Sequence, residues 1–232
     1  MAMLGNKKLV LSFVFLVLLT SWSYEALIIF NGGIPEYYAY ALLVPLALAL
    51  ITGLLCVILD VRQFALIGVD ALRAMGPITL SVLAFGLLGA FGEELGWRGF
   101  LLPKMIAADI PHPYLASGIV WAIWHLPLIA FGSFYQTTNA LMVSAYAMSI
   151  IAMTFVISEL RLRSGSVWVA TLLHASHNFF SQLAVPAFIL ARPGSRSKQW
   201  DVLGGDSGMI VAMLYAMTFL FFLRKIKPAK KH

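Results

Sequence analysis

Long runs of apolar residues alternate with short polar stretches along the whole chain. Seven such runs cover residues 9–30, 37–59, 77–102, 113–131, 140–158, 166–190 and 207–223. A helix needs about 20 predominantly apolar residues to cross the hydrocarbon core of a bilayer. These runs are continuous, whereas the strands of a transmembrane barrel alternate apolar and polar residues in segments of about ten. The pattern therefore predicts an all-α fold, a polytopic bundle of seven or eight transmembrane helices.

The polar stretches between the runs are too short to separate domains. They lie at Asn31–Pro35, Gly132–Asn139, Glu159–Gly165 and Arg192–Gly205. We therefore expect one membrane domain over residues 1–232, with accessory helices in 1–76, a core in 77–190, a last span in 207–223 and a basic tail in 224–232. Charged residues spaced among apolar ones over 60–76 predict an interfacial amphipathic helix.

Composition and charge support a membrane location. The chain is 61% hydrophobic and only 11% charged, whereas soluble domains are roughly 45–50% apolar and about 25% charged. The net charge of +6 comes with basic residues gathered at Lys7-Lys8 and Arg224–Lys231, beside apolar runs. This arrangement follows the positive-inside rule and the attraction of anionic headgroups, and it does not indicate nucleic acid.

These charges do not fully determine on which side of the membrane each terminus lies. Both basic clusters favour the cytoplasm, which requires an even number of crossings, yet seven runs are visible. Either residues 60–76 contribute to an eighth span, or one terminus departs from the charge rule. Arg161 and Arg163 agree with a cytoplasmic C-terminus. We expect a multi-pass protein of a bacterial plasma membrane, and nothing in the sequence indicates its oligomeric state.

Two features have simple structural explanations. Lys7-Lys8, the apolar stretch after them and Ser21-Trp22-Ser23 have the form of a signal peptide. The apolar run continues to Phe30, however, so an uncleaved first helix is the preferred interpretation. Cys56 has no second cysteine to pair with and lies in an apolar run, which indicates a buried, inert thiol.

Ionisable residues inside the runs are candidates for function, because a charge at the centre of a bilayer costs roughly 2.5–3.5 kcal/mol on insertion scales. The candidates are Glu25, Glu93, Glu94, Arg98, His125, His174 and His177, with the neutral Asn178 beside them. Glu25 lies near the end of its run, where snorkelling of the carboxylate to the interface explains it.

Helical geometry gives different surroundings to the three charges in the sequence Glu93-Glu94-Leu-Gly-Trp-Arg98. Glu94 and Arg98 are four residues apart, in the order that favours an ion pair. Glu93 is turned about 100° away on the helix and has no local partner. A carboxylate without a partner in a medium of low dielectric constant suits a general base. The alternative is a charge cluster that only locks helices together.

Nearby glycines and two further polar sites complete the candidate chemistry. Gly92 and Gly96 form a GxxxG pair, which predicts close approach of a neighbouring helix. His125 lies in an aromatic run before Pro127, and His174 shares a helix face with Asn178. One carboxylate, two histidines and an amide provide a base, its assistant and oxyanion donors for hydrolysis by water. Glu93, His125 and His174 also form a set that could bind zinc, and the residues alone leave that choice open.

Three motifs in order resemble the CAAX-protease and bacteriocin-processing family, to which the type II CAAX prenyl endopeptidases are related. Glu93–Arg98 is similar to EExxxR, Trp121–His125 to FxxxH, and His174–Asn178 to HxxxN. Trp121 replaces the usual phenylalanine, a change expected to alter pocket shape more than chemistry. His177 is an additional ionisable residue, which is either a bystander or tunes His174.

This resemblance implies an intramembrane glutamyl endopeptidase that uses no cofactor. Glu93 and His125 would activate water, His174 and Asn178 would bind the oxyanion, and Glu94 with Arg98 would orient the site. The substrate would be a membrane-associated peptide, with the bilayer as the other partner. Zinc dependence stays open, and a non-proteolytic scaffold, such as an immunity or regulatory protein, is the alternative from another class, beside a small transporter.

Other intramembrane proteases agree less well with the sequence. Gly204-Gly205-Asp206 resembles half of an aspartyl-protease motif, but no second aspartate lies within a run. Ala116-Ser117-Gly118 provides a serine for a rhomboid-like mechanism, although the same residues are equally typical of a helix-packing patch.

Overall fold

The structure is a computed structural model that describes residues 35–64, 69–130, 140–191, 202–205 and 208–225. The expected first span, Glu25, the possible signal peptide, Asp206 and most of the basic tail lie outside these residues. Eleven helical and strand elements precede the last described helix. They are α2 (Pro35–Ile58), β1 (Arg62–Phe64), α3 (Val69–Glu94), η1 (Leu95–Leu101), α4 (Leu102–Ala107), α5 (Pro113–Ala130), α6 (Ala140–Ser164), α7 (Val167–Asn178), η2 (Phe179–Ala184), α8 (Val185–Phe188) and β2 (Ile189–Ala191), followed by α10 (Met209–Lys225).

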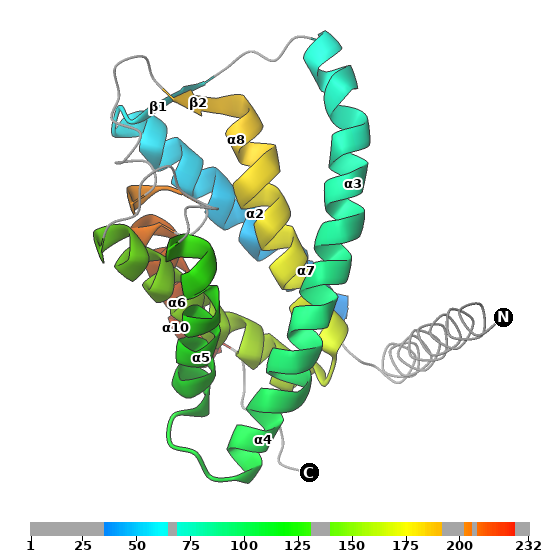
Figure 1. Cartoon of the computed structure of the whole chain (residues 1–232), viewed down its shortest axis with the longest axis vertical. Helices are drawn as coiled ribbons and strands as arrows, with labels where there is room; N and C mark the ends of the chain where they lie inside the picture. Colours follow the sequence, from blue (N-terminus) through cyan, green and yellow to red (C-terminus); the bar gives the residue numbers. More distant parts are fainter. Residues whose placement is uncertain (1–34, 65–68, 131–139, 192–201, 206–207, 226–232) are drawn as a thin grey trace, which may run out of the picture.

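The described helices form two packed groups that meet at α7 (Figure 1). On one side α7 packs against α2 and the long helix α3, and on the other α6 packs against α5 and α10. The core between them is apolar and aromatic, with Trp121, Tyr215 and Phe222 almost completely buried. The molecule is therefore mostly helical, as the apolar runs predict.

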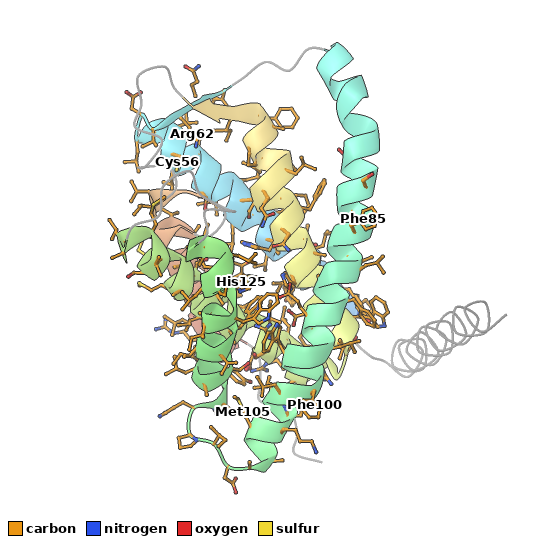
Figure 2. All side chains as sticks on the ribbon, viewed as in Figure 1. Cys56, Arg62, Phe85, Phe100, Met105 and His125 are labelled. Carbon is orange, nitrogen blue, oxygen red and sulfur yellow. The ribbon has the colours of Figure 1, made fainter. Side chains whose placement is uncertain are left out.

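Many large apolar side chains face outward from this bundle. Phe85 on α3 is 75% exposed and Phe100 on η1 is 64% exposed (Figure 2). Exposed apolar surface on this scale indicates an apolar solvent, as a lipid bilayer provides. Two described helices, α2 and α6, are long and apolar enough to cross a bilayer, and the apolar helices α5 and α10 are shorter. The number of seven or eight spans stays a prediction.

The predicted amphipathic helix over 60–76 is wrong in its first half. Asp60 has a φ of 61°, which ends α2, and Arg62–Phe64 form strand β1. This strand pairs antiparallel with β2, with Arg62 opposite Ala191 and Phe64 opposite Ile189. Pairing with a distant segment overrides the local periodicity, and the fold is consequently not strictly all-α. Helix α3 begins at Val69 and takes up the rest of the predicted segment.

Two other predicted boundaries also differ from the structure. The polar stretch from Glu159 was expected to separate two spans, but α6 continues to Ser164. It does so because Arg163 pairs with Glu159 one turn earlier and the Tyr114 hydroxyl donates to Glu159 at 2.9 Å. The run 166–190 is not one uniform helix, since α7 is followed by a π-helical segment, a short α-helix and strand β2.

Close helix approach occurs at Gly118 and not at the predicted GxxxG pair. A Cβ atom built at Gly92 or Gly96 would meet no atom of the described residues within 4 Å. At Gly118 of α5 it would lie 3.2 Å from the Ile151 Cα and the Thr154 side chain of α6. Gly118 therefore permits the close approach of α5 to α6.

We expect Gly118→Val to destabilise the protein by about 1–3 kcal/mol, because the added side chain forces α6 outward. Thermal unfolding in detergent measures this effect. Gly89→Val is the matched control, since Gly89 lies on α3 with open space where its Cβ would be. Equal stability of the two variants would contradict the packing role of Gly118.

Candidate active site

Four of the predicted site residues line one cavity of about 190 Å³ inside the bundle. Glu93 comes from α3, His125 from α5, and His174 and Asn178 from α7. His177, Tyr146 and Gln182 contribute to the same wall. Three segments that are far apart in the sequence therefore bring a carboxylate, imidazoles and an amide to one cavity.

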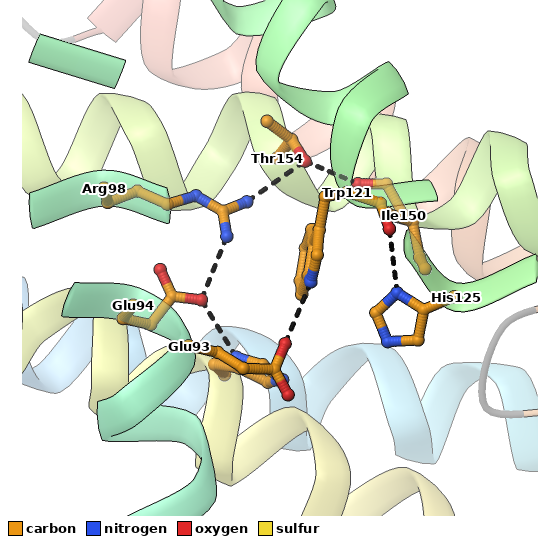
Figure 3. A network of polar contacts seen from close by, with 8 residues as sticks. Glu93, Glu94, Arg98, Trp121, His125, Ile150 and Thr154 are labelled. Carbon is orange, nitrogen blue, oxygen red and sulfur yellow. Dashed lines mark hydrogen bonds and ion pairs between the residues drawn. The ribbon is translucent and has the colours of Figure 1, made fainter. Parts of the chain in front are cut away.

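Glu94 and Arg98 lie directly beside this cavity, completely buried. The Arg98 Nη1 donates to Glu94 Oε1 at 2.9 Å, and both side chains are 0% exposed. The predicted ion pair is thus confirmed. Arg98 Nη2 donates to the Thr154 hydroxyl of α6 at 3.0 Å, and that hydroxyl donates to the Ile150 carbonyl (Figure 3). The pair connects α3–η1 to α6 as well as neutralising its own charge.

The Glu94 carboxylate also determines the protonation pattern of His174. The Nδ1 atom of His174 lies 2.9 Å from Glu94 Oε1. Because an ionised carboxylate only accepts, His174 Nδ1 carries a proton and donates it in this bond. The other ring nitrogen, Nε2, takes no part in this bond and is available to a molecule in the cavity that His174 lines.

His125 has an equally defined tautomer. Its Nδ1 lies 2.9 Å from the backbone carbonyl oxygen of Trp121, one turn earlier on α5. A carbonyl oxygen only accepts, so Nδ1 is the protonated nitrogen and Nε2 bears the lone pair when the ring is neutral. His125 is buried against Trp124 and Tyr146, which fix the ring plane. The ring is therefore held as a hydrogen-bond acceptor.

Glu93 is partly buried and has a partner that sequence reasoning did not identify. Its Oε2 accepts a hydrogen bond from the indole Nε1 of Trp121 at 2.9 Å (Figure 3). Trp121 was recognised only as the first residue of a motif, while Thr154 was not recognised. The available signal for the contact between Arg98 and Thr154 was a threonine in the apolar run 140–158.

The remaining polar residues of α7 point in two directions. Asn178 Oδ1 accepts from the Gln182 amide at 3.5 Å, so its NH₂ end is the part left to donate. The His177 Nδ1 lies 3.0 Å from the Tyr215 hydroxyl of α10 and 3.4 Å from the Ser181 hydroxyl. His177 thus connects α7 to α10, and the contact to Tyr215 was not expected from the sequence.

Two of the three motif helices change their winding next to the site. Glu94 is followed immediately by the π-helical segment η1, and Asn178 by the π-helical segment η2. Such wide turns are uncommon and occur frequently at functional sites. They interrupt the regular helix at the two positions where polar side chains meet the cavity.

A second, larger cavity adjoins the first one. It measures about 620 Å³ and is lined mainly by apolar residues of α2, α3, α7 and η2. Asn178 and Gln182 belong to the walls of both cavities. The polar site therefore has an apolar space as its neighbour.

The serine considered for a competing mechanism lies outside the cavity lining. Ser117 is buried on α5 but is not among the residues that line the cavity. Among the described residues, no group of three or more His, Cys, Asp or Glu side chains is placed to hold a metal ion. Cys56 is buried in α2, as predicted.

Fold and site together define a mostly helical, apolar protein with a buried carboxylate–histidine centre. Comparison with known proteins finds a family model that matches part of the chain. Residues 75–180 match the family model described as Type II CAAX prenyl endopeptidase Rce1-like. The resemblance indicated by the three motifs is thus confirmed over that segment, which contains all of them.

A curated relative has a related description. CAAX prenyl protease 2 of Methanococcus maripaludis is 39% identical over 56 residues, which are 24% of this chain. The aligned part spans 21% of that relative, about a fifth of its length.

Proposed function

We propose that the protein is an intramembrane endopeptidase that hydrolyses a peptide bond of a membrane-associated peptide. The observation that supports this most directly is the single cavity shared by Glu93, His125, His174 and Asn178. The family match and the curated protease support the same class of reaction.

Glu93 is the proposed general base. Its carboxylate takes a proton from a water molecule, and the water oxygen forms a bond to the carbonyl carbon of the peptide. The carbon–nitrogen bond then breaks, and the proton moves to the leaving nitrogen. His125 assists, because its Nε2 lone pair accepts the second hydrogen of the water and holds that water in line.

His174 and Asn178 are the proposed oxyanion donors. Asn178 donates through its NH₂ group. His174 donates through Nε2 only when both ring nitrogens carry protons, because Nδ1–H is already bonded to Glu94. The charges of Glu94 and Arg98 cancel each other. A protonated His174 would therefore supply the net positive charge that faces the oxyanion. This arrangement explains why an ion pair is buried beside the site.

The proposed substrate has an apolar part next to the bond that is cut. The larger apolar cavity shares Asn178 and Gln182 with the polar one, so a chain that occupies both passes these two side chains. We place the protein in a bacterial plasma membrane as a multi-pass protein, with its C-terminus in the cytoplasm.

The test uses the purified full chain in phosphatidylglycerol-containing liposomes, with a farnesylated C-terminal peptide and an unmodified hydrophobic peptide as probes. We expect internal cleavage of at least one probe, seen by mass spectrometry, and we expect it to persist in excess EDTA with zinc-free protein. Loss of activity in EDTA with recovery on adding zinc would contradict the metal-free mechanism. Failure to cleave a wider panel of membrane peptides would favour the non-proteolytic scaffold.

A further inference from the structure

Trp121 touches more of the candidate site than any residue of the predicted set. It is 2% exposed, and its indole N–H donates to Glu93 Oε2 at 2.9 Å. Its backbone carbonyl accepts from His125 Nδ1 at 2.9 Å. One residue of α5 therefore holds the proposed base through its side chain and the proposed assistant through its backbone.

The indole ring also contacts the charged groups behind the base. The Arg98 guanidinium carbon lies 4.2 Å from the ring centroid, within the range of a cation–π contact. The His174 ring meets the same indole edge-on at 5.2 Å between centroids. Trp121 thus contacts both Glu93 and the Arg98 guanidinium (Figure 3).

This position limits where the Glu93 carboxylate can point. A glutamate side chain has several rotamers, and a single N–H donor on a buried, rigid ring selects among them. The bond to Oε2 fixes one carboxylate oxygen and leaves Oε1 for the cavity that Glu93 lines. An N–H donor also favours the ionised form of a carboxylate, which is the form a base requires.

We propose that Trp121 is a positioning residue whose indole N–H orients the Glu93 carboxylate toward the cavity. The proposal rests on the proposed role of Glu93 as the base. It also revises the expectation that tryptophan at this position affects mainly the shape of the pocket, since phenylalanine has no N–H to donate.

The first test is Trp121→Phe, which keeps an aromatic ring and removes the donor. We expect kcat for the farnesylated probe to fall about ten- to hundred-fold, the loss typical of a hydrogen bond to a charged group, with KM nearly unchanged. The split between kcat and KM is the diagnostic result, because a base that points away from the water slows the reaction without weakening peptide binding.

Trp168→Phe is the matched control. Trp168 of α7 stacks on Phe91 of α3 at 4.5 Å, away from the residues that line the cavity. We expect it to change stability while leaving kcat unchanged. If Trp121→Phe lowered only the melting temperature and left kcat in place, the residue would be a packing residue and the proposal would fail.

A second measurement needs no cleavage and therefore separates this proposal from the proposed function. In detergent micelles, the indole ¹H–¹⁵N resonance of Trp121 is identified by its absence from Trp121→Phe. We expect this resonance to shift as the pH is lowered and Glu93 takes up a proton, and to stop shifting in Glu93→Gln. An identical pH response in Glu93→Gln would overturn the proposal, even if the protein cleaved its probe.

Discussion

Replacing Glu93 by glutamine is expected to lower kcat about 10²- to 10⁴-fold, the range that general acid–base catalysis contributes. Glutamine has nearly the same shape, and its carbonyl oxygen can still accept from the Trp121 indole. The variant therefore keeps its fold and its affinity for the peptide while losing the group that removes a proton from water. Single-turnover cleavage of the farnesylated probe measures the rate of this step.

Glu36→Gln is the matched control for this result. Glu36 lies in the first turn of α2 and is exposed, so the same change of charge occurs far from the cavity. Its rate should equal that of the unmodified protein. If Glu93→Gln kept more than a tenth of the original rate with an unchanged melting temperature, another group would be the base.

Arg98→Met is expected to cause the largest loss of stability, about 3–5 kcal/mol. Methionine fills a similar length but leaves Glu94 as a buried charge that still accepts a hydrogen bond from His174. Glu94 Oε2 already has no hydrogen-bond partner among the described residues, so little else compensates the lost guanidinium. Denaturant titration of the detergent-solubilised protein measures the change.

A second substitution distinguishes charge from packing in this prediction. In the double variant Glu94→Gln with Arg98→Met, neither charge remains, and the amide oxygen can still accept from His174. We expect this variant to recover more than half of the lost stability. Lys104→Met controls for the loss of an exposed positive charge. A double variant as unstable as Arg98→Met would mean that the cost comes from packing alone.

Local spacing predicted those parts of the site that depend on one helix. The Glu94–Arg98 pair follows from the i,i+4 relation alone. The shared face of His174 and Asn178 follows from the same geometry, and both line the cavity. Convergence of the three motifs was expected from the combined chemistry of their residues and from the resemblance to a family, because periodicity gives no distance between helices.

Contacts between helices were not available from the sequence. The bonds from Trp121 to Glu93, from Arg98 to Thr154 and from His174 to Glu94 join residues 28, 56 and 80 positions apart. Each depends on how two helices are rotated against each other, which apolar runs do not specify. The π-helical winding of η1 and η2 could not be predicted from the sequence either, since no residue pattern marks a π-helical turn. The strand β1 was missed because its partner lies far along the chain.

The bond between His177 and Tyr215 has a consequence for the biosynthesis of the protein. Tyr215 follows His177 by 38 positions in the chain. At a synthesis rate of about 5–20 residues per second, the ribosome needs roughly two to eight seconds to add them. During that interval α7 already exists while the hydroxyl that anchors His177 does not. All three motifs are therefore synthesised before the residue that holds His177 in place, and the contact between α7 and α10 can form only after them.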